Sequence, residues 1–131
     1  MNNSRQRYQN LITLARHEFP HLIQSAKLID GTFTAPRKMR ITLLDHSFLD
    51  VWLSFDGDYA YHWEHRAQDG GLHRWDNAPH FPQIASYPHH CHEGSESNVI
   101  ESHIPQENAE AVLRYILDFI EGQISHRATS T

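Results

Sequence analysis

The residues best suited to chemistry are concentrated in one stretch of the chain, residues 59–92. This stretch holds seven of the twelve histidines, two of the three tryptophans and three of the six prolines. Histidine can move protons near neutral pH and can bind metal ions, and proline fixes the path of a loop. An ordinary surface loop needs none of this density. We therefore predict that residues 59–92 carry the functional site.

One chemistry that fits these residues is metal-independent cleavage of RNA. The 2′-hydroxyl of RNA can attack the neighbouring phosphate, so the protein needs only a base, an acid and a cation. Arg74 is the cation candidate, because its planar guanidinium matches phosphate oxygens. The candidate catalytic residues are His62, Arg74, Asp76, His80, His89 and His90. The candidates for binding a base of the substrate are Trp75, Asn77 and Tyr87.

A second chemistry that fits is a metal site. His90 and His92 point the same way if their segment is extended, and imidazole and thiolate suit zinc or a similar divalent ion. The candidate ligands are His90, His92 and Cys91, which His80, His89 or Asp76 could complete. Such a site would be either catalytic or structural. A third hypothesis is a binding protein without enzymatic activity, in which the same residues form an interface.

Some of these residues also have a purely structural interpretation. Tyr61 and Trp63 are predicted core residues, and Trp75 fits either the core or the site. Asp76 and Asn77 could only cap the turn that follows them, because Asx side chains bond nearby backbone amides. The histidines predicted to be plain surface residues are His17, His21, His46, His73, His103 and His126.

The elements that must position the site follow from hydrophobic periodicity. An apolar stripe predicts a helix from Ser4 to Phe19, which Pro20 ends. Alternation then predicts strands at 27–34, 38–44, 48–55, 59–66 and 72–76. The first has Ile29 and Phe33 on one face, and the third has Phe55 facing inward. The expected fold is α+β: an N-terminal helix, an antiparallel meander of about five strands, a Pro/His-rich loop and a C-terminal amphipathic helix.

One face of this meander is predicted to form the floor of the site. Its residues are Lys38, Arg40, Trp52, His62, Glu64 and Arg66. The loop covers residues 77–96, and residues 97–103 could add a short edge strand. The last helix is expected to begin near Pro105 and to stop at Gly122, followed by a frayed tail at 123–131.

Length and composition limit the classes of function. A chain of 131 residues, 39% hydrophobic and 21% charged, predicts a single globular domain over residues 1–131. A formal charge of −5 does not predict general nucleic-acid binding, so contact with RNA would need a local patch. The single cysteine excludes an internal disulfide and fits a reducing cytoplasm. Neither a secretory signal nor a membrane span is expected.

Three motifs together resemble the family of TumE-like toxins, which are small prokaryotic proteins of toxin–antitoxin modules. The motifs are Tyr59-x-Tyr61-His62-Trp63, Arg74-Trp75-Asp76-Asn77-Ala78-Pro79-His80-x-Pro82 and Pro88-His89-His90-x-His92. The resemblance implies a cytoplasmic toxin that is silenced by a helix-turn-helix antitoxin protein. It brings no defined catalytic mechanism and transfers no catalytic residue or metal ligand. Cys91 departs from the residue type expected inside this histidine tract.

From these observations, the leading hypothesis is a toxin that cleaves RNA by histidine acid–base chemistry. A histidine-cluster metalloprotein of other hydrolytic activity and a non-enzymatic binding toxin are the alternatives. The expected partners are the antitoxin and RNA, with no membrane. Whether two copies associate as a homodimer is left open.

Overall fold

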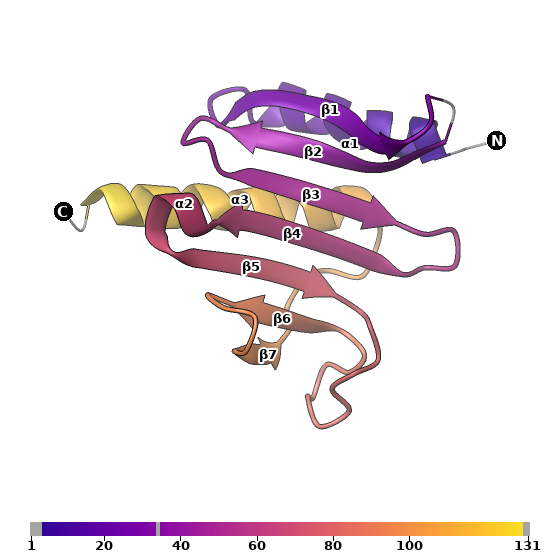
Figure 1. Cartoon of the computed structure of the whole chain (residues 1–131), viewed down its shortest axis with the longest axis vertical. Coiled ribbons are helices and arrows are strands. Elements are labelled where there is room, and N and C mark those ends of the chain that lie inside the picture. The colour runs from indigo at the N-terminus through magenta and orange to yellow at the C-terminus, as the bar shows by residue number, and fades with distance from the viewer. Residues whose placement is uncertain (1–3, 34, 130–131) are drawn as a thin grey trace.

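Alternating apolar residues build one antiparallel sheet, which two long helices cover on one face (Figure 1). The computed structural model describes residues 4–33 and 35–129. The strands lie across the sheet in sequence order: β1 (Ile23–Gly31), β2 (Pro36–Leu43), β3 (Phe48–Leu53), β4 (Tyr59–His65), β5 (Gly71–Asp76), β6 (His90–Glu93) and β7 (Val99–Glu101). The helices are α1 (Ser4–Glu18), the single turn α2 (Arg66–Asp69) and α3 (Ala109–Thr129).

The core lies between the sheet and the two long helices. Met39, Ile41 and Leu43 alternate along β2 and are all fully buried, as the sequence pattern predicts. Tyr61 and Trp63 follow the same rule on β4. In Figure 1, α1 lies behind β1 and β2, and α3 lies behind the middle of the sheet. Strand side chains alternate between the two faces of a sheet, so every second side chain points away from this core. In the part of the chain described here, no long helix covers that other face, which we call the open face.

That open face carries the predicted floor of the site. The strand registers place Lys38 opposite Trp52, and Arg40 opposite Asp50. The registers of the next two strands place Asp50 opposite His62 and His62 opposite Arg74, so Arg40, Asp50, His62 and Arg74 form one row across the sheet. Arg40 and Asp50 form a bidentate ion pair at 2.7 and 2.9 Å. Arg66 is displaced from the row, because it begins α2 rather than ending β4.

The α+β layout is confirmed, but the expected count of about five strands is wrong, since residues 4–33 and 35–129 form a sheet of seven. Of the two additional strands, β7 lies within residues 97–103, where a short edge strand was expected, whereas β6 lies inside the stretch that the sequence predicts to be loop. The sequence signal for β6 is weak, because its four residues, His-Cys-His-Glu, contain no β-branched or aromatic residue. The strand is held instead by backbone pairing on both sides, with β5 and with β7.

Several predicted boundaries are also corrected. Phe33 and Phe55 lie beyond the ends of β1 and β3 and are 75% and 72% exposed, so neither faces the core. Thr34, the predicted end of the first strand, lies outside the described residues. The last helix does not stop at Gly122 but continues to Thr129, so most of the expected tail is helical. The turns of this extension are tied to the rest of the fold by Arg127, which forms ion pairs with Asp45 and Asp69.

Candidate active site

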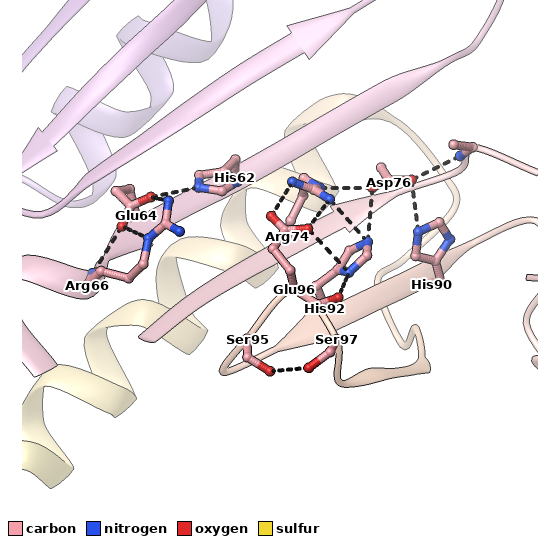
Figure 2. Close-up of polar contacts among 11 residues, drawn as sticks. His62, Glu64, Arg66, Arg74, Asp76, His90, His92, Ser95, Glu96 and Ser97 are labelled. Atoms are coloured by element: carbon pink, nitrogen blue, oxygen red, sulfur yellow. Dashed lines mark hydrogen bonds and ion pairs between the residues drawn. The ribbon is translucent and has the colours of Figure 1, made fainter. Parts of the chain in front are cut away.

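Two strands, β5 and β6, bring four of the candidate residues together on the open face. In the ladder between β5 and β6, Arg74 lies opposite His92 and Asp76 opposite His90. Side chains two residues apart on a strand share a face, so all four point to the same side of the sheet. The addition of β6 to the sheet is therefore what assembles the site, as Figure 2 shows.

Asp76, His90 and His92 form what we call the cleft cluster. His90 Nε2 lies 3.0 Å from Asp76 Oδ1, and His92 Nε2 lies 3.7 Å from Asp76 Oδ2. The three side chains converge so that one ligand atom of each lies within 4.8 Å of the others. The residues are buried, with exposed fractions of 7%, 1% and 5%. Such convergence of one carboxylate and two imidazoles suits either proton transfer or metal binding.

Backbone carbonyls fix the orientation of both imidazoles. His92 Nδ1 donates to the carbonyl of Glu96 at 2.8 Å, and His90 Nδ1 donates to the carbonyl of Pro88 at 3.2 Å. These bonds aim the Nε2 atom of each ring at Asp76. The carboxylate is itself held by the amide of Ala78, which donates to Oδ1 at 3.0 Å. The predicted capping role of Asp76 is therefore real, and it coexists with the cluster.

Arg74 supplies the positive charge beside the cluster. Its Nε donates to Asp76 at 3.2 Å, and its Nη2 donates to His92 Nε2 at 3.3 Å. Glu96 binds the same guanidinium with both carboxylate oxygens, each at 2.8 Å (Figure 2). Arg74, through a hydrogen bond, and charge attraction lower the pKa of Glu96 against the opposing effect of burial. Glu96 thus stays ionised and holds Arg74 in place.

The cluster opens on a cleft of about 500 Å³. Trp52, Tyr59 and Phe81 give the cleft aromatic walls, and the ring of Phe81 meets that of His90 edge-on at 4.7 Å. A second cavity of about 390 Å³ continues along the open face over His62, sharing Trp52 and Arg74 with the first. Burial raises the pKa of the Tyr59 hydroxyl, and the charge of Asp76 adds to this effect.

The structure brings together part of the predicted set. The predicted residues that line the cleft are Arg74, Asp76, Asn77, His80, His90 and His92. Asn77 has mainly structural bonds there, accepting from the amide of Tyr59 and donating to the carbonyl of Gly57. His62 lies in the adjoining cavity, where it is paired with Glu64 at 3.1 Å.

Four predicted residues lie elsewhere. Trp75 and Cys91 face each other across β5 and β6 on the helix side, so Cys91 does not join His90 and His92 as a ligand. His89 bonds the Tyr59 hydroxyl at 2.7 Å and lines a separate cavity beside the start of α3. Tyr87 is 46% exposed and does not line the cleft.

A second group of histidines, which was not predicted from the sequence, lies on the helix side of the sheet. His73 is buried rather than on the surface, and its Nδ1 lies 2.9 Å from His65 Nε2. His65 Nδ1 in turn lies 2.6 Å from Asp69. We call Asp69, His65 and His73 the helix-side cluster. Burial, and secondly the neighbouring His65, lower the pKa of His73 to about 4. Alternation with Trp63 and Trp75 along the two strands is the signal that could have placed both rings inward.

The fold and the site define a small α+β protein with an Asp–His–His cluster and an arginine in a cleft of its open sheet face. In a comparison with family models, the model described as Toxin TumE matches residues 12–124, which include the whole cleft. The chain therefore belongs to the Toxin TumE family. This confirms the resemblance and identifies a toxin component, which implies an antitoxin partner.

The comparison with curated proteins found no match, and neither did the comparison with solved structures. In the described part of the chain, no helix is both long enough and apolar enough to cross a membrane.

Proposed function

We propose that this toxin is an endoribonuclease that cleaves RNA in the cleft by histidine acid–base chemistry. The observation that carries the proposal is the convergence of Arg74 and the cleft cluster on one cavity with aromatic walls. Cleavage by the RNA's own 2′-hydroxyl needs a base, an acid and a cation, and each has a candidate here.

His92 is the residue we assign as the general base. Because its Nδ1 donates to the carbonyl of Glu96, the neutral ring carries its lone pair on Nε2, inside the cleft. Nε2 accepts only a long bond of 3.3 Å from Arg74. In the proposed step it takes the proton of the 2′-hydroxyl, and the 2′-oxygen forms a bond to phosphorus.

His90 is the residue we assign as the general acid. Its two ring nitrogens face the carbonyl of Pro88 and the carboxylate of Asp76, which are both acceptors. The ring can donate to both acceptors when it is an imidazolium, and its Nε2–H then lies in the cleft cluster beside Asp76. The proton passes to the 5′-oxygen as its bond to phosphorus breaks. The products are a 2′,3′-cyclic phosphate and a free 5′-hydroxyl.

Arg74 and Trp52 are the residues we assign to substrate binding. Once an incoming phosphate competes with Glu96, the guanidinium of Arg74 can bind two of its oxygens and stabilise the charge that develops during attack. Trp52 lies between the two cavities of the open face, where a base can stack on its ring. This assignment replaces Trp75 and Tyr87 as stacking residues.

Membership of the toxin family supports a proposal about the partner and the compartment. We infer that the antitoxin is a helix-turn-helix protein and that the toxin acts in the cytoplasm on cellular RNA. The net charge of −5 means that binding must rely on the local charge of Arg74 and its neighbours.

The test is incubation of the purified, antitoxin-free chain with labelled RNA, with and without a chelator. We expect cleavage to persist in the chelator and to leave cyclic phosphate ends. Arg74→Gln should lower the rate by about 10²- to 10³-fold, and the surface variant His46→Asn should match the wild type. A chelator that abolishes cleavage would instead show a metal-dependent hydrolase. No cleavage under either condition would exclude RNA as the substrate and favour a binding toxin.

A further inference from the structure

We propose that Asp76, His90 and His92 also form a binding site for one divalent transition-metal ion of the zinc type, and that the bound ion inhibits the toxin. The metal site stands on the geometry of the three side chains alone. The inhibition rests on the proposed function, because it assumes that the same ring nitrogens transfer protons.

The distances in the cluster match those of a tetrahedral site. Zinc binds imidazole nitrogen and carboxylate oxygen at about 2.0 Å, which places neighbouring ligand atoms about 3.3 Å apart. His90 Nε2 lies 3.0 Å from Oδ1 of Asp76 and His92 Nε2 lies 3.7 Å from Oδ2, so each imidazole is already near that distance from one oxygen of the carboxylate. All three ligand atoms lie within 4.8 Å of one another, so small side-chain shifts would complete the geometry.

The outer hydrogen bonds of the two rings are an independent observation that points to a metal ion. Metal-bound histidine usually donates its other ring N–H to a carbonyl or carboxylate, which fixes the tautomer and the direction of the ligand atom. Here the carbonyls of Pro88 and Glu96 accept from the Nδ1 atoms of His90 and His92. Both Nε2 atoms are thereby directed at the same carboxylate.

The ligand set indicates which ions should bind. Two imidazoles and one carboxylate suit zinc, cobalt, nickel or copper, whereas magnesium prefers oxygen ligands and keeps its waters. Three protein ligands leave the fourth position of a tetrahedron unfilled by the protein, and all three side chains line the cleft. Cys91 contributes nothing, because its side chain lies in the core on the opposite face of the sheet.

Arg74 is the residue that should weaken metal binding. Its guanidinium donates to His92 Nε2 at 3.3 Å and to Asp76 at 3.2 Å, so it occupies the lone pairs that an ion would need. Its positive charge also repels a cation at this distance. Glu96 binds Arg74 with both carboxylate oxygens, which allows the guanidinium to stay bound when the ion enters.

Inhibition follows from the same lone pairs. An ion on His92 Nε2 removes the base, and an ion on His90 Nε2 removes the proton that the acid would donate. RNA cleavage and metal binding are therefore alternative uses of one cluster.

The first experiment measures binding directly, without reference to activity. The full chain is stripped with a chelator and titrated with Co²⁺, whose visible absorption reports coordination, and Zn²⁺ is then added to displace it. We expect one ion per chain and no displacement by Mg²⁺. Asp76→Asn and His92→Gln should each weaken binding at least about tenfold. His46→Asn, which removes an exposed histidine and keeps its positive φ backbone acceptable, should bind like the wild type.

Arg74→Gln provides the sharpest control, because its two expected effects have opposite signs. It should tighten Co²⁺ binding by about tenfold, as the competing charge is gone, while it lowers RNA cleavage. Circular dichroism of each variant shows that the fold is kept. Binding that is unchanged in Asp76→Asn and His92→Gln, or that needs several ions per chain, would overturn the metal site.

The second experiment measures cleavage of labelled RNA as Zn²⁺ is added to the stripped chain. We expect cleavage to fall with the occupancy measured by Co²⁺ displacement. Activation by Zn²⁺ would overturn the inhibition and the acid–base assignment together, and would leave the site standing. Absence of Co²⁺ binding, with cleavage intact, would overturn the metal site and leave the proposed function standing.

Discussion

The protein contains two clusters of the same composition, one aspartate with two histidines, on opposite faces of one sheet. The cleft cluster lies on β5 and β6 and faces the open side. The helix-side cluster joins β4, α2 and β5 and faces the helices. All four histidines are buried, so exposure alone does not distinguish the clusters.

The two clusters differ in the pattern of their hydrogen bonds. In the helix-side cluster the polar atoms form a chain, in which His73 donates to His65 and His65 donates to Asp69. The ring of Trp63 stacks on His65 with the ring centroids 3.8 Å apart. In the cleft cluster the two Nε2 atoms converge on one carboxylate beside a cavity. The first arrangement completes its bonds internally, whereas the second places its two Nε2 atoms beside an open cavity.

The type of a residue therefore does not decide its role in this protein. Histidine and aspartate can stabilise a fold or carry out chemistry, and the direction of their lone pairs and the space beside them determine which. The helix-side cluster should therefore matter for stability, and the cleft cluster for activity.

The largest expected effect comes from paired substitutions of the two aspartates. Asp76→Asn should lower RNA cleavage by about 10²- to 10⁴-fold, because the acid loses the charge that stabilises it. Asp69→Asn should leave cleavage per folded molecule unchanged and lower the free energy of unfolding by about 1–3 kcal/mol, since His65 loses a charged acceptor. Cleavage rates and urea unfolding of both variants check this. Equal loss of cleavage activity in the two variants would contradict the assignment of separate roles to the two clusters.

A smaller effect is expected from pH acting on the helix-side cluster. The fold lowers the pKa of His73 from 6.5 to about 4, through burial and secondly through His65. The unfolded chain therefore takes up this proton at a higher pH than the folded chain. The stability that comes from neutral His73 is full above about pH 6.5 and is lost as the pH falls toward about 4, by up to about 3 kcal/mol.

Urea unfolding at a series of pH values isolates this effect when the wild type is compared with His73→Asn. The asparagine amide can still donate to His65 but does not titrate. We expect a shallower pH dependence of stability in the variant between pH 4 and 6.5. Identical slopes in the two proteins would mean that His73 does not contribute to acid sensitivity.

The smallest effect is expected at Cys91, which lies on β6 between His90 and His92 but points to the opposite face of the sheet. Burial, and then the charges of Glu93 and Asp76, raise the pKa of its thiol to about 12. A thiol reagent should therefore label the unfolded chain and spare the folded one. Cys91→Ala should leave RNA cleavage and Co²⁺ affinity unchanged and cost about 1 kcal/mol of stability. A loss of Co²⁺ binding in this variant would restore Cys91 to the ligand set.

Much of the fold was predictable because its strands alternate strongly. Met39, Ile41 and Leu43 set the inward face of β2, and the same rule placed Trp52 on the open side. The prediction failed where a strand lacks such residues. The sequence of β6 predicts a loop, because the strand is held by backbone pairing with β5 and β7 rather than by its own side chains. Such pairing leaves no local pattern in the sequence.

The sequence indicated the position of the candidate site along the chain more accurately than it indicated which residues form it. Residues 59–92 do contain Arg74 and the cleft cluster. The same stretch also supplied Trp75 to the core and His89 to another cavity, since adjacent residues of a strand point in opposite directions. Glu96 and Phe81, which hold Arg74 and cover His90, carried no signal that distinguished them from ordinary loop residues.

The sequence by itself determined the presence of the two long helices, the first five strands and the stretch in which the candidate site lies. These features depend on local periodicity and composition, which act over a few residues. The tertiary structure alone decided that His90 and His92 join Asp76 and that His65 and His73 turn away to join Asp69. That division depends on the register between strands and on the faces that the helices cover, and both are set by contacts between residues far apart in the chain.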